Sequence, residues 1–291
     1  MREYRKAVFM CQLLAGFSLV LSAPGTADEV TPLAQFIQSR SAAAWSEPGT
    51  IMQGRVKFVT GSDIWQPGEQ FADGSDWLAL VCHQTACRLQ PAQLTVQANS
   101  WQGHYDDSPT AGQTLLFKTA EVGEGNVVVW FATAKLQTWL TPGEVTTWYS
   151  PQGTSRPATG KGTLEAEVAL PDGSVAELVP LMWTVAAQDR LEPGGDHYSS
   201  RYYLQLRSQG TRQMLLGELG TCYGINGITP EEYLRWAGDL DRDGAADYLI
   251  SYIDGEGPVH LYLSGDRKPG QLVGLSGVYA SPPFGGECSG D

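Results

Sequence analysis

Four aspartates alternate with other residues near the C-terminal end of the chain, in the segment GDLDRDGAAD at residues 238–247. Counted from Asp239 as position 1, carboxylates stand at positions 1, 3, 5 and 9, those of Asp239, Asp241, Asp243 and Asp247. Like charges this close oppose one another's ionisation, so a bare cluster destabilises itself or raises its own pKa values. A bound cation removes that cost, and the spacing therefore predicts a metal site. A solvated acidic turn without an ion is the alternative.

The expected cation is calcium. Calcium takes about six to eight oxygen ligands in flexible geometry, whereas magnesium keeps several waters and needs fewer protein ligands. The backbone carbonyl of Ala245, at position 7, adds one oxygen, and Gly244 permits the sharp bend that turns the carboxylates inward. The predicted ligands are therefore Asp239, Asp241, Asp243, Ala245 and Asp247.

The residues after the loop distinguish it from an EF-hand. An EF-hand needs a bidentate glutamate at position 12, where this chain has Ile250. The segment resembles instead the FG-GAP type of calcium loop, D-x-D-x-D-G-x-x-D followed by an apolar strand, known from integrin α-subunit propellers and many exported bacterial proteins. The resemblance covers about fifteen of the 291 residues and implies calcium binding but no reaction. No second copy of the motif occurs, which argues against a calcium propeller.

The chain departs from the FG-GAP pattern at one position. Arg242 stands where that pattern commonly has glycine. We expect its charge to weaken calcium binding somewhat. We also expect its backbone to lie where a left-handed turn is favoured.

Signatures of common enzymes are missing from the sequence, among them the nucleophile elbow, the zinc-protease helix and the dinucleotide fingerprint. Weaker groupings could do acid–base chemistry or could be ordinary polar loops. They are His104 with Asp106 and Asp107, Asp196 with His197, and Asp254 and Glu256 with His260. Glu165 and Glu167 imitate a glycosidase pair, although the solvated side of a strand is expected for them. Enzymatic activity is left open.

The chain has nine tryptophans, which either form a glycan-binding face or fill a β core. Candidates for an exposed face are Trp65, Trp101, Trp139 and Trp148. Trp130, Trp183 and Trp236 lie in apolar stretches and are expected in the core.

Residues 1–27 read as a secretory signal, with a basic start, an apolar run from Ala7 to Leu21 and small residues before Asp28. A membrane anchor is the alternative, but the run is shorter than the ~20 residues of a spanning helix. Lipid attachment at Cys11 is disfavoured because that cysteine lies early in the run. We expect a periplasmic or secreted protein with no stable membrane span after cleavage.

The negative net charge and the even number of cysteines after residue 27 are consistent with an exported protein. A net charge of −13 disfavours nucleic acid and anionic membranes, and suits divalent cations and protein or glycan partners. The cysteines after the signal are Cys82, Cys87, Cys222 and Cys288, an even number that favours disulfides. Cys82 with Cys87 is the natural local pair and leaves Cys222 with Cys288. A zinc site at Cys82, His83 and Cys87 is the alternative.

Most segments read as strands, so the predicted fold is mainly β, with sandwich-like antiparallel sheets, short helices and a β-rich C-terminal calcium-loop region. Hairpins are expected at Thr163–Trp183, turning at Asp172-Gly173, and at Arg201–Leu219, turning near Gly210. A short helix is expected near Pro32 and a helical turn after Thr229.

The stretch Ser150–Gly162 lacks large apolar residues and reads as a linker between domains 28–150 and 151–291, or as a long loop in one sandwich. The sequence favours an exported, calcium-stabilised binding or interaction protein. The alternative is an exported hydrolase acting on glycan or peptidoglycan.

Overall fold

The computed structural model describes residues 52–61, 64–66, 71–83, 86–102, 108–119, 127–132, 139–150, 158–159, 165–184, 200–215, 230–251 and 258–280. The predicted mainly β, antiparallel fold is confirmed, and no helix in these ranges reaches seven residues. None of the helices in the described part is long and apolar enough to cross a membrane. The signal segment, the helix near Pro32, Cys222 with Cys288, and the groups around His104, His197 and Asp254 lie outside the described residues.

The first sheet is nearly closed. Its strands in spatial order are β1 (Met52–Gly54), β17 (Gly274–Tyr279), β16 (Val259–Leu263), β15 (Asp247–Ser251), β14 (Leu234–Asp239), β8 (Gly143–Tyr149), β5 (Ala86–Trp101), β4 (Gly74–His83), β7 (Val127–Ala132) and β2 (Phe58–Val59). β6 (Thr110–Thr119) also pairs with β5, and β3 (Ile64–Gln66) pairs with β6. The end strands β1 and β2 are joined by residues 55–57, where the Val56 amide donates to the Ser276 carbonyl at 2.9 Å.

The second sheet has five antiparallel strands. In spatial order they are β13 (Thr211–Met214), β12 (Ser200–Ser208), β11 (Val175–Thr184), β10 (Ala166–Ala169) and β9 (Ala158–Thr159). Both predicted hairpins are confirmed in this sheet. β10 and β11 turn at Asp172-Gly173, and β12 and β13 turn at Gln209-Gly210, where both residues have positive φ, 48° and 79°. Two consecutive residues of positive φ are typical of a type I′ turn, a common two-residue hairpin connection.

Strands from both sides of residue 150 share the first sheet. β8 pairs with β14, and β1 pairs with β17. The first sheet therefore includes segments of both predicted domains.

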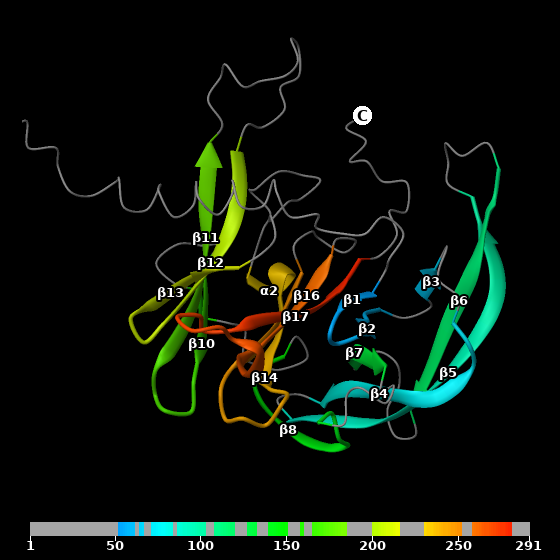
Figure 1. Cartoon of the computed structure of the whole chain (residues 1–291), viewed down its shortest axis with the longest axis horizontal. Helices are drawn as coiled ribbons and strands as arrows, with labels where there is room; N and C mark the ends of the chain where they lie inside the picture. Colours follow the sequence, from blue (N-terminus) through cyan, green and yellow to red (C-terminus); the bar gives the residue numbers. More distant parts are fainter. Residues whose placement is uncertain are drawn as a thin grey trace, which may run out of the picture. The chain divides into compact units, whose positions relative to one another are not determined.

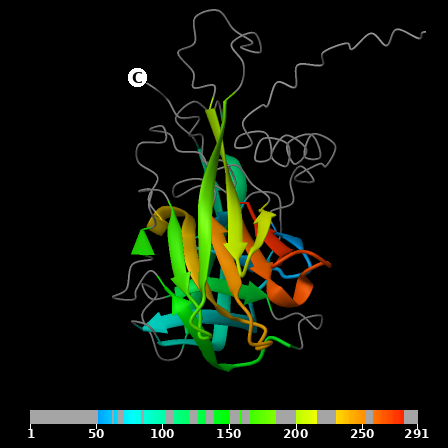
Figure 2. The same cartoon turned by 90° about the vertical axis from the view of Figure 1, so that its left-hand side faces the viewer.

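Strands β14 to β16 are buried on both faces, with the five-stranded sheet against one of them (Figures 1 and 2). Trp236, Leu249 and Leu261 enter the core inside the nearly closed sheet. Tyr248, Ile250 and Tyr262 enter a second core. That core is completed by residues of the five-stranded sheet, among them Leu178, Leu204 and Leu206. All ten residues of β15 and β16 are consequently buried, which explains why these strands lack the polar alternation of a half-exposed sheet.

Cys82 and Cys87 are paired across β4 and β5 and form a disulfide, as predicted. Both sulfurs are used in that bond, so the alternative zinc site on these thiols is wrong.

The described tryptophans confirm two of the three core predictions and contradict two of the four surface predictions. Trp130 and Trp236 are 1% exposed and confirm the predicted core. Trp139 and Trp148, expected on an open face, are instead half-buried because each packs against one of the two cores. The Arg55 guanidinium also lies 5.3 Å from the centroid of the Trp139 ring. The side chains of Trp65, Trp101 and Trp183 lie outside the described set.

The helical turn expected after Thr229 is present as α2 (Pro230–Tyr233), directly before β14. A 3₁₀ turn, η4 (Ser264–Asp266), follows β16. β14, β15 and η4 together position the acidic loop.

Candidate metal centre

The acidic loop connects two neighbouring antiparallel strands. Asp239 is the last residue of β14 and Asp247 is the first of β15, and Gly238 is paired with Asp247 in the sheet. The pairing brings the two ends of the loop together, so the intervening residues must wind back above the strand ends. This winding is what converts alternating sequence positions into a convergent set of side chains.

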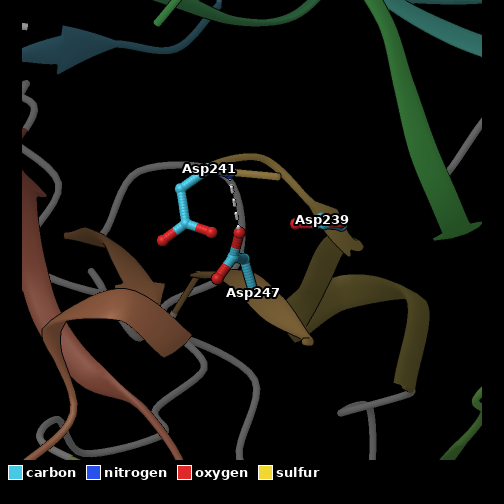
Figure 3. A group of neighbouring side chains, drawn as sticks. All are labelled: Asp239, Asp241 and Asp247. Carbon is cyan, nitrogen blue, oxygen red and sulfur yellow. Dashed lines mark hydrogen bonds between the residues drawn. The ribbon is translucent and has the colours of Figure 1, made fainter. Parts of the chain in front are cut away.

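Three carboxylates converge in this loop. One oxygen from each of Asp239, Asp241 and Asp247 lies within 4.8 Å of the others. Figure 3 shows the carboxylates of Asp241 and Asp247 facing each other, with Asp239 approaching from β14. The three side chains form an acidic cluster that could hold a metal ion.

Asp247 is fully buried and is held by three backbone N–H groups. Its Oδ2 accepts hydrogen bonds from the amides of Leu240, at 2.7 Å, and Asp241, at 3.3 Å. Its Oδ1 accepts one from the amide of Ser264, at 2.7 Å. Burial raises the pKa of Asp247 to about 7, and the charge of Asp241 adds to the rise, while the N–H donors act against it.

Asp241 is partly buried between the loop and η4. Its Oδ1 accepts from the Asp243 amide at 3.3 Å, and its Oδ2 accepts from the Gly265 amide at 3.2 Å. Burial raises the pKa of Asp241, and the neighbouring charges of Asp243 and Asp239 raise it further. A Cβ on Gly265 would overlap Oδ2 of Asp241, so a larger residue there would displace this carboxylate.

Asp239 carries the least satisfied oxygen of the cluster. Its Oδ2 accepts a 3.1 Å hydrogen bond from the amide of Gly244, whose φ of 84° is favourable only for glycine. Its Oδ1 is buried and accepts no hydrogen bond from any residue in the described ranges. A buried carboxylate oxygen without a partner is costly, and a cation bound between the carboxylates would satisfy it.

Asp243, the fourth predicted carboxylate, is not part of the convergent group. Its Oδ1 accepts from Ser264 Oγ and from the Ala245 amide, both at 2.8 Å. Its Oδ2 lies 3.6 Å from the Arg267 guanidinium. The structure thus brings three of the four predicted carboxylates together and turns the fourth toward the segment after β16. The roles of Asp243 and of the Ala245 carbonyl as ligands stay predictions.

Arg242 adopts the left-handed backbone conformation expected at its position, with a φ of 62°. Its guanidinium donates to Thr141 Oγ1 at 2.6 Å, to the Thr141 carbonyl at 3.1 Å and to the Glu144 carbonyl at 3.5 Å. The side chain therefore ties the loop to the segment that precedes and begins β8. The expected weakening of calcium binding by its charge stays a prediction.

Ser264, Gly265 and Arg267 contact the loop but were not anticipated from the sequence. They lie more than fifteen residues beyond the motif and reach it only because β15 and β16 are antiparallel neighbours. One sequence signal could have located them: the apolar strand after the loop ends at Leu263, and the residues that follow an antiparallel neighbour of β15 return to the start of β15.

The described residues do not bring any of the predicted acid–base groupings together. His260 is buried in β16, whereas its sequence neighbours Asp254 and Glu256 lie outside the described residues. Glu165 and Glu167 are half-buried, and Glu167 is paired with Glu177 across β10 and β11.

Comparison of the chain with protein-family models, with curated proteins and with solved structures gave no match.

Proposed function

We propose that this chain is an exported, calcium-stabilised binding or interaction protein. The supporting observation is the buried, unpartnered Oδ1 of Asp239 in a cluster with Asp241 and Asp247. Calcium bound there would accept Oδ1 of Asp239 as a ligand and would favour the ionised forms of Asp241 and Asp247, which burial disfavours. Asp243 and the Ala245 carbonyl would complete the set once the Asp243 side chain turned away from Ser264 and Arg267.

Calcium is the cation that the ligand chemistry favours. All the available ligands are oxygens, which suit a hard cation, and they come from an irregular loop that can adjust to calcium's flexible geometry. Magnesium demands near-ideal octahedral geometry and retains its waters. The resemblance to FG-GAP loops, which rests on the same aspartates, supports the same ion.

A calcium ion here would have a structural role, because it would link separate segments of the fold. It would join the end of β14 to the start of β15 and, through the hydrogen bonds of Asp247 and Asp241, to η4. An extracellular-type module binds calcium with a Kd on the order of 10⁻⁴–10⁻³ M. At ~1 mM calcium and a Kd of ~0.1 mM, binding stabilises the fold by about 1.4 kcal/mol.

A periplasmic or extracellular location is part of the proposal. It is supported by the signal-like residues 1–27 and by the Cys82–Cys87 disulfide, which persists in oxidising compartments. Calcium levels in such compartments match the modest affinity expected of the site.

Thermal unfolding of the chain from Asp28 onward tests the calcium site. The melting temperature should rise when ~1 mM calcium, a level suited to extracellular-type modules, replaces EDTA, and magnesium should give a smaller rise. Asp241→Ala should abolish the rise. Asp172→Ala, which removes an exposed aspartate from another turn, is the matched control and should retain it. A wild-type melting temperature that calcium leaves unchanged would contradict the proposal.

A further inference from the structure

A cavity of about 410 Å³ adjoins the acidic loop. The loop residues Gly244 to Ala246 form one wall, and the turns of the five-stranded sheet form another. Segment 267–273, which follows η4, forms a third. Sites for small molecules commonly measure about 300–1,000 Å³ and combine apolar walls with a few placed polar groups, and this cavity has the size of such a site.

The apolar part of the cavity includes one large aromatic side chain with accessible surface. Trp148, at the end of β8, is half-buried against the second core and lines the cavity beside Leu170, Leu206 and Leu272. An indole presents a wide, flat apolar surface at little entropic cost. The C–H face of a sugar ring is the common biological surface that is flat, apolar and surrounded by hydroxyl groups.

The polar part of the cavity offers both donors and acceptors. The Gln209 amide nitrogen donates to Asp172 Oδ2 at 2.9 Å, which leaves the Gln209 amide oxygen without a partner among the described residues. The Gln271 amide oxygen accepts from the Lys268 amide at 3.1 Å, and its amide nitrogen is likewise without a partner there. Hydroxyl groups both donate and accept, so a polyol suits this pair of open amide atoms.

The cavity walls are held in place before any ligand arrives. The side chain of Gln213, on β13, accepts from the amides of Leu272 at 2.6 Å and Val273 at 3.0 Å, and donates to the Val273 carbonyl at 2.8 Å. These bonds fix Leu272 and Val273 to the five-stranded sheet. A preformed wall lowers the entropic cost of binding.

The charges around the cavity favour an uncharged ligand. Asp172 and Arg267 line it with opposite signs, and the whole chain carries a net charge of −13, which repels anions. A cationic ligand would meet the Arg267 guanidinium. The amides of Gln209 and Gln271 are exposed to water, and an apolar peptide that covered them would not replace those hydrogen bonds.

We propose that this cavity binds an uncharged sugar residue of a glycan and that calcium in the adjoining loop strengthens the binding. The sugar ring packs on Trp148, and its hydroxyls bond to the amides of Gln209 and Gln271. The calcium dependence rests on the proposed function. Asp243 precedes the wall formed by Gly244 to Ala246, and its Oδ2 lies 3.6 Å from the Arg267 guanidinium, which also donates to the Ser264 carbonyl at 3.2 Å. A calcium ion that took Asp243 as a ligand would therefore reposition this wall of the cavity, while Arg267 would keep its bond to Ser264.

Saturation-transfer NMR tests the sugar site, with the methyl glycosides of glucose, galactose, mannose and N-acetylglucosamine as probes and the chain from Asp28 as protein. At least one probe should give saturation transfer in calcium. Trp148→Ala and Gln271→Ala should each weaken its affinity about tenfold, or about 1.4 kcal/mol. Trp148→Phe should retain most of it. Gln97→Ala, an exposed glutamine on β5, is the matched control and should leave the affinity unchanged.

Four outcomes overturn the sugar site: no probe bound, an affinity that both Trp148→Ala and Gln271→Ala leave unchanged, binding of glucuronate alone, or binding of an apolar peptide in place of the sugars. Circular dichroism of each variant shows whether it has folded. If Trp148→Ala has not, the affinity of Gln271→Ala decides whether the sugar site stands.

Calcium binding is measured separately by isothermal titration, so the two proposals can fail independently. Removing calcium should weaken sugar binding about fivefold, the lower end of ordinary coupling between sites. Calcium binding without any sugar binding overturns the sugar site alone. Sugar binding without calcium binding overturns the calcium site and the coupling but supports the sugar site.

Discussion

Two turns of this protein use aspartate side chains in opposite electrostatic environments. Asp172, between β10 and β11, is exposed, and its Oδ1 accepts from the hydroxyl of Ser174 at 2.6 Å and its amide at 2.9 Å. These hydrogen bonds, led by that from the hydroxyl, hold the pKa of Asp172 below its ordinary value. In the loop between β14 and β15, burial instead raises the pKa values of Asp241 and Asp247.

The difference shows what exposure and crowding do to one residue type. The Asp172 turn is complete, because water and local donors stabilise its single charge. The acidic loop gathers three carboxylates of which Asp247 is fully buried and Asp241 partly buried, and one buried oxygen of Asp239 has no partner in the described structure. In the proposed function a bound cation completes the second turn, and the following predictions test that contrast.

The largest effect is expected from Asp247→Ala. It leaves the amides of Leu240, Asp241 and Ser264 without their acceptor, and an unsatisfied buried donor costs about 1–3 kcal/mol. The free energy of unfolding, measured with urea in EDTA, should therefore fall by about 3 kcal/mol or more. Asp172→Ala should cause a far smaller loss, because its donors are exposed to water. Equal losses in the two variants would contradict the contrast between the turns.

The pH dependence of stability should have the sign set by Asp247. Its folded-state pKa of about 7 lies above an unfolded value near 4, so between these pH values the folded state binds more protons than the unfolded state. Stability without metal should therefore fall as the pH rises from about 4 to about 7, by a few kcal/mol at most. Urea unfolding in EDTA across this range measures the slope, and Asp247→Asn should flatten it.

Calcium should oppose this pH dependence. In the proposed function the ion would bind the ionised carboxylates and displace the proton of Asp247, so its affinity should increase as the pH approaches 7. Isothermal titration at several pH values, in buffers of different ionisation enthalpy, measures both the affinity and the protons released. An affinity independent of pH over this range would mean that Asp247 does not ionise on binding.

A smaller effect is expected at Arg242, whose φ of 62° is unfavourable for a side chain. Arg242→Ala loses the hydrogen bonds to Thr141 and Glu144 and keeps the unfavourable backbone. Arg242→Gly loses the same bonds but relieves the backbone, so it should be more stable than the alanine variant by about 1 kcal/mol. Urea unfolding of both variants in EDTA gives this difference. Equal stabilities would mean that the loop relaxes out of the left-handed conformation.

The smallest effect is expected at Asp172. Because the pKa of Asp172 is lowered in the folded state, its ionised carboxylate stabilises the fold at pH values above the unfolded-state pKa. This stabilisation is lost as the pH falls, which is the reverse of the sign at Asp247. Asp172→Asn should therefore slightly reduce stability at neutral pH and leave the calcium-induced rise in melting temperature unchanged. Thermal melts with calcium and with EDTA check both points. A diminished calcium response would show that the two turns are coupled.

Local sequence was sufficient for the elements whose structure depends on local chemistry. The Asp172-Gly173 and Gln209-Gly210 turns, the strands beside them, and the Cys82–Cys87 disulfide all follow from residues a few positions apart. The left-handed conformation of Arg242 was expected from the resemblance to FG-GAP loops, which commonly have glycine at that position.

The burial of the tryptophans was predictable only in part. Trp130 and Trp236 stand in apolar runs and are buried. Trp139 and Trp148 have polar neighbours in sequence, yet pack against cores that strands far away in the chain complete. Their burial depends on contacts between distant segments, which a local pattern does not contain.

The sequence by itself determined that the protein is mainly β, that its acidic loop has the spacing of a cation site, and that Cys82 pairs with Cys87. Turn geometry, strand pattern and ligand spacing act over a few residues, so composition and order are enough to define them. Only the tertiary structure decided that Asp239, Asp241 and Asp247 converge while Asp243 turns to Ser264 and Arg267. Pairing of β15 with β16 brings η4 against the loop, and the burial of Asp241 and Asp247 raises their pKa values. Long-range pairing and solvent exclusion produce both effects.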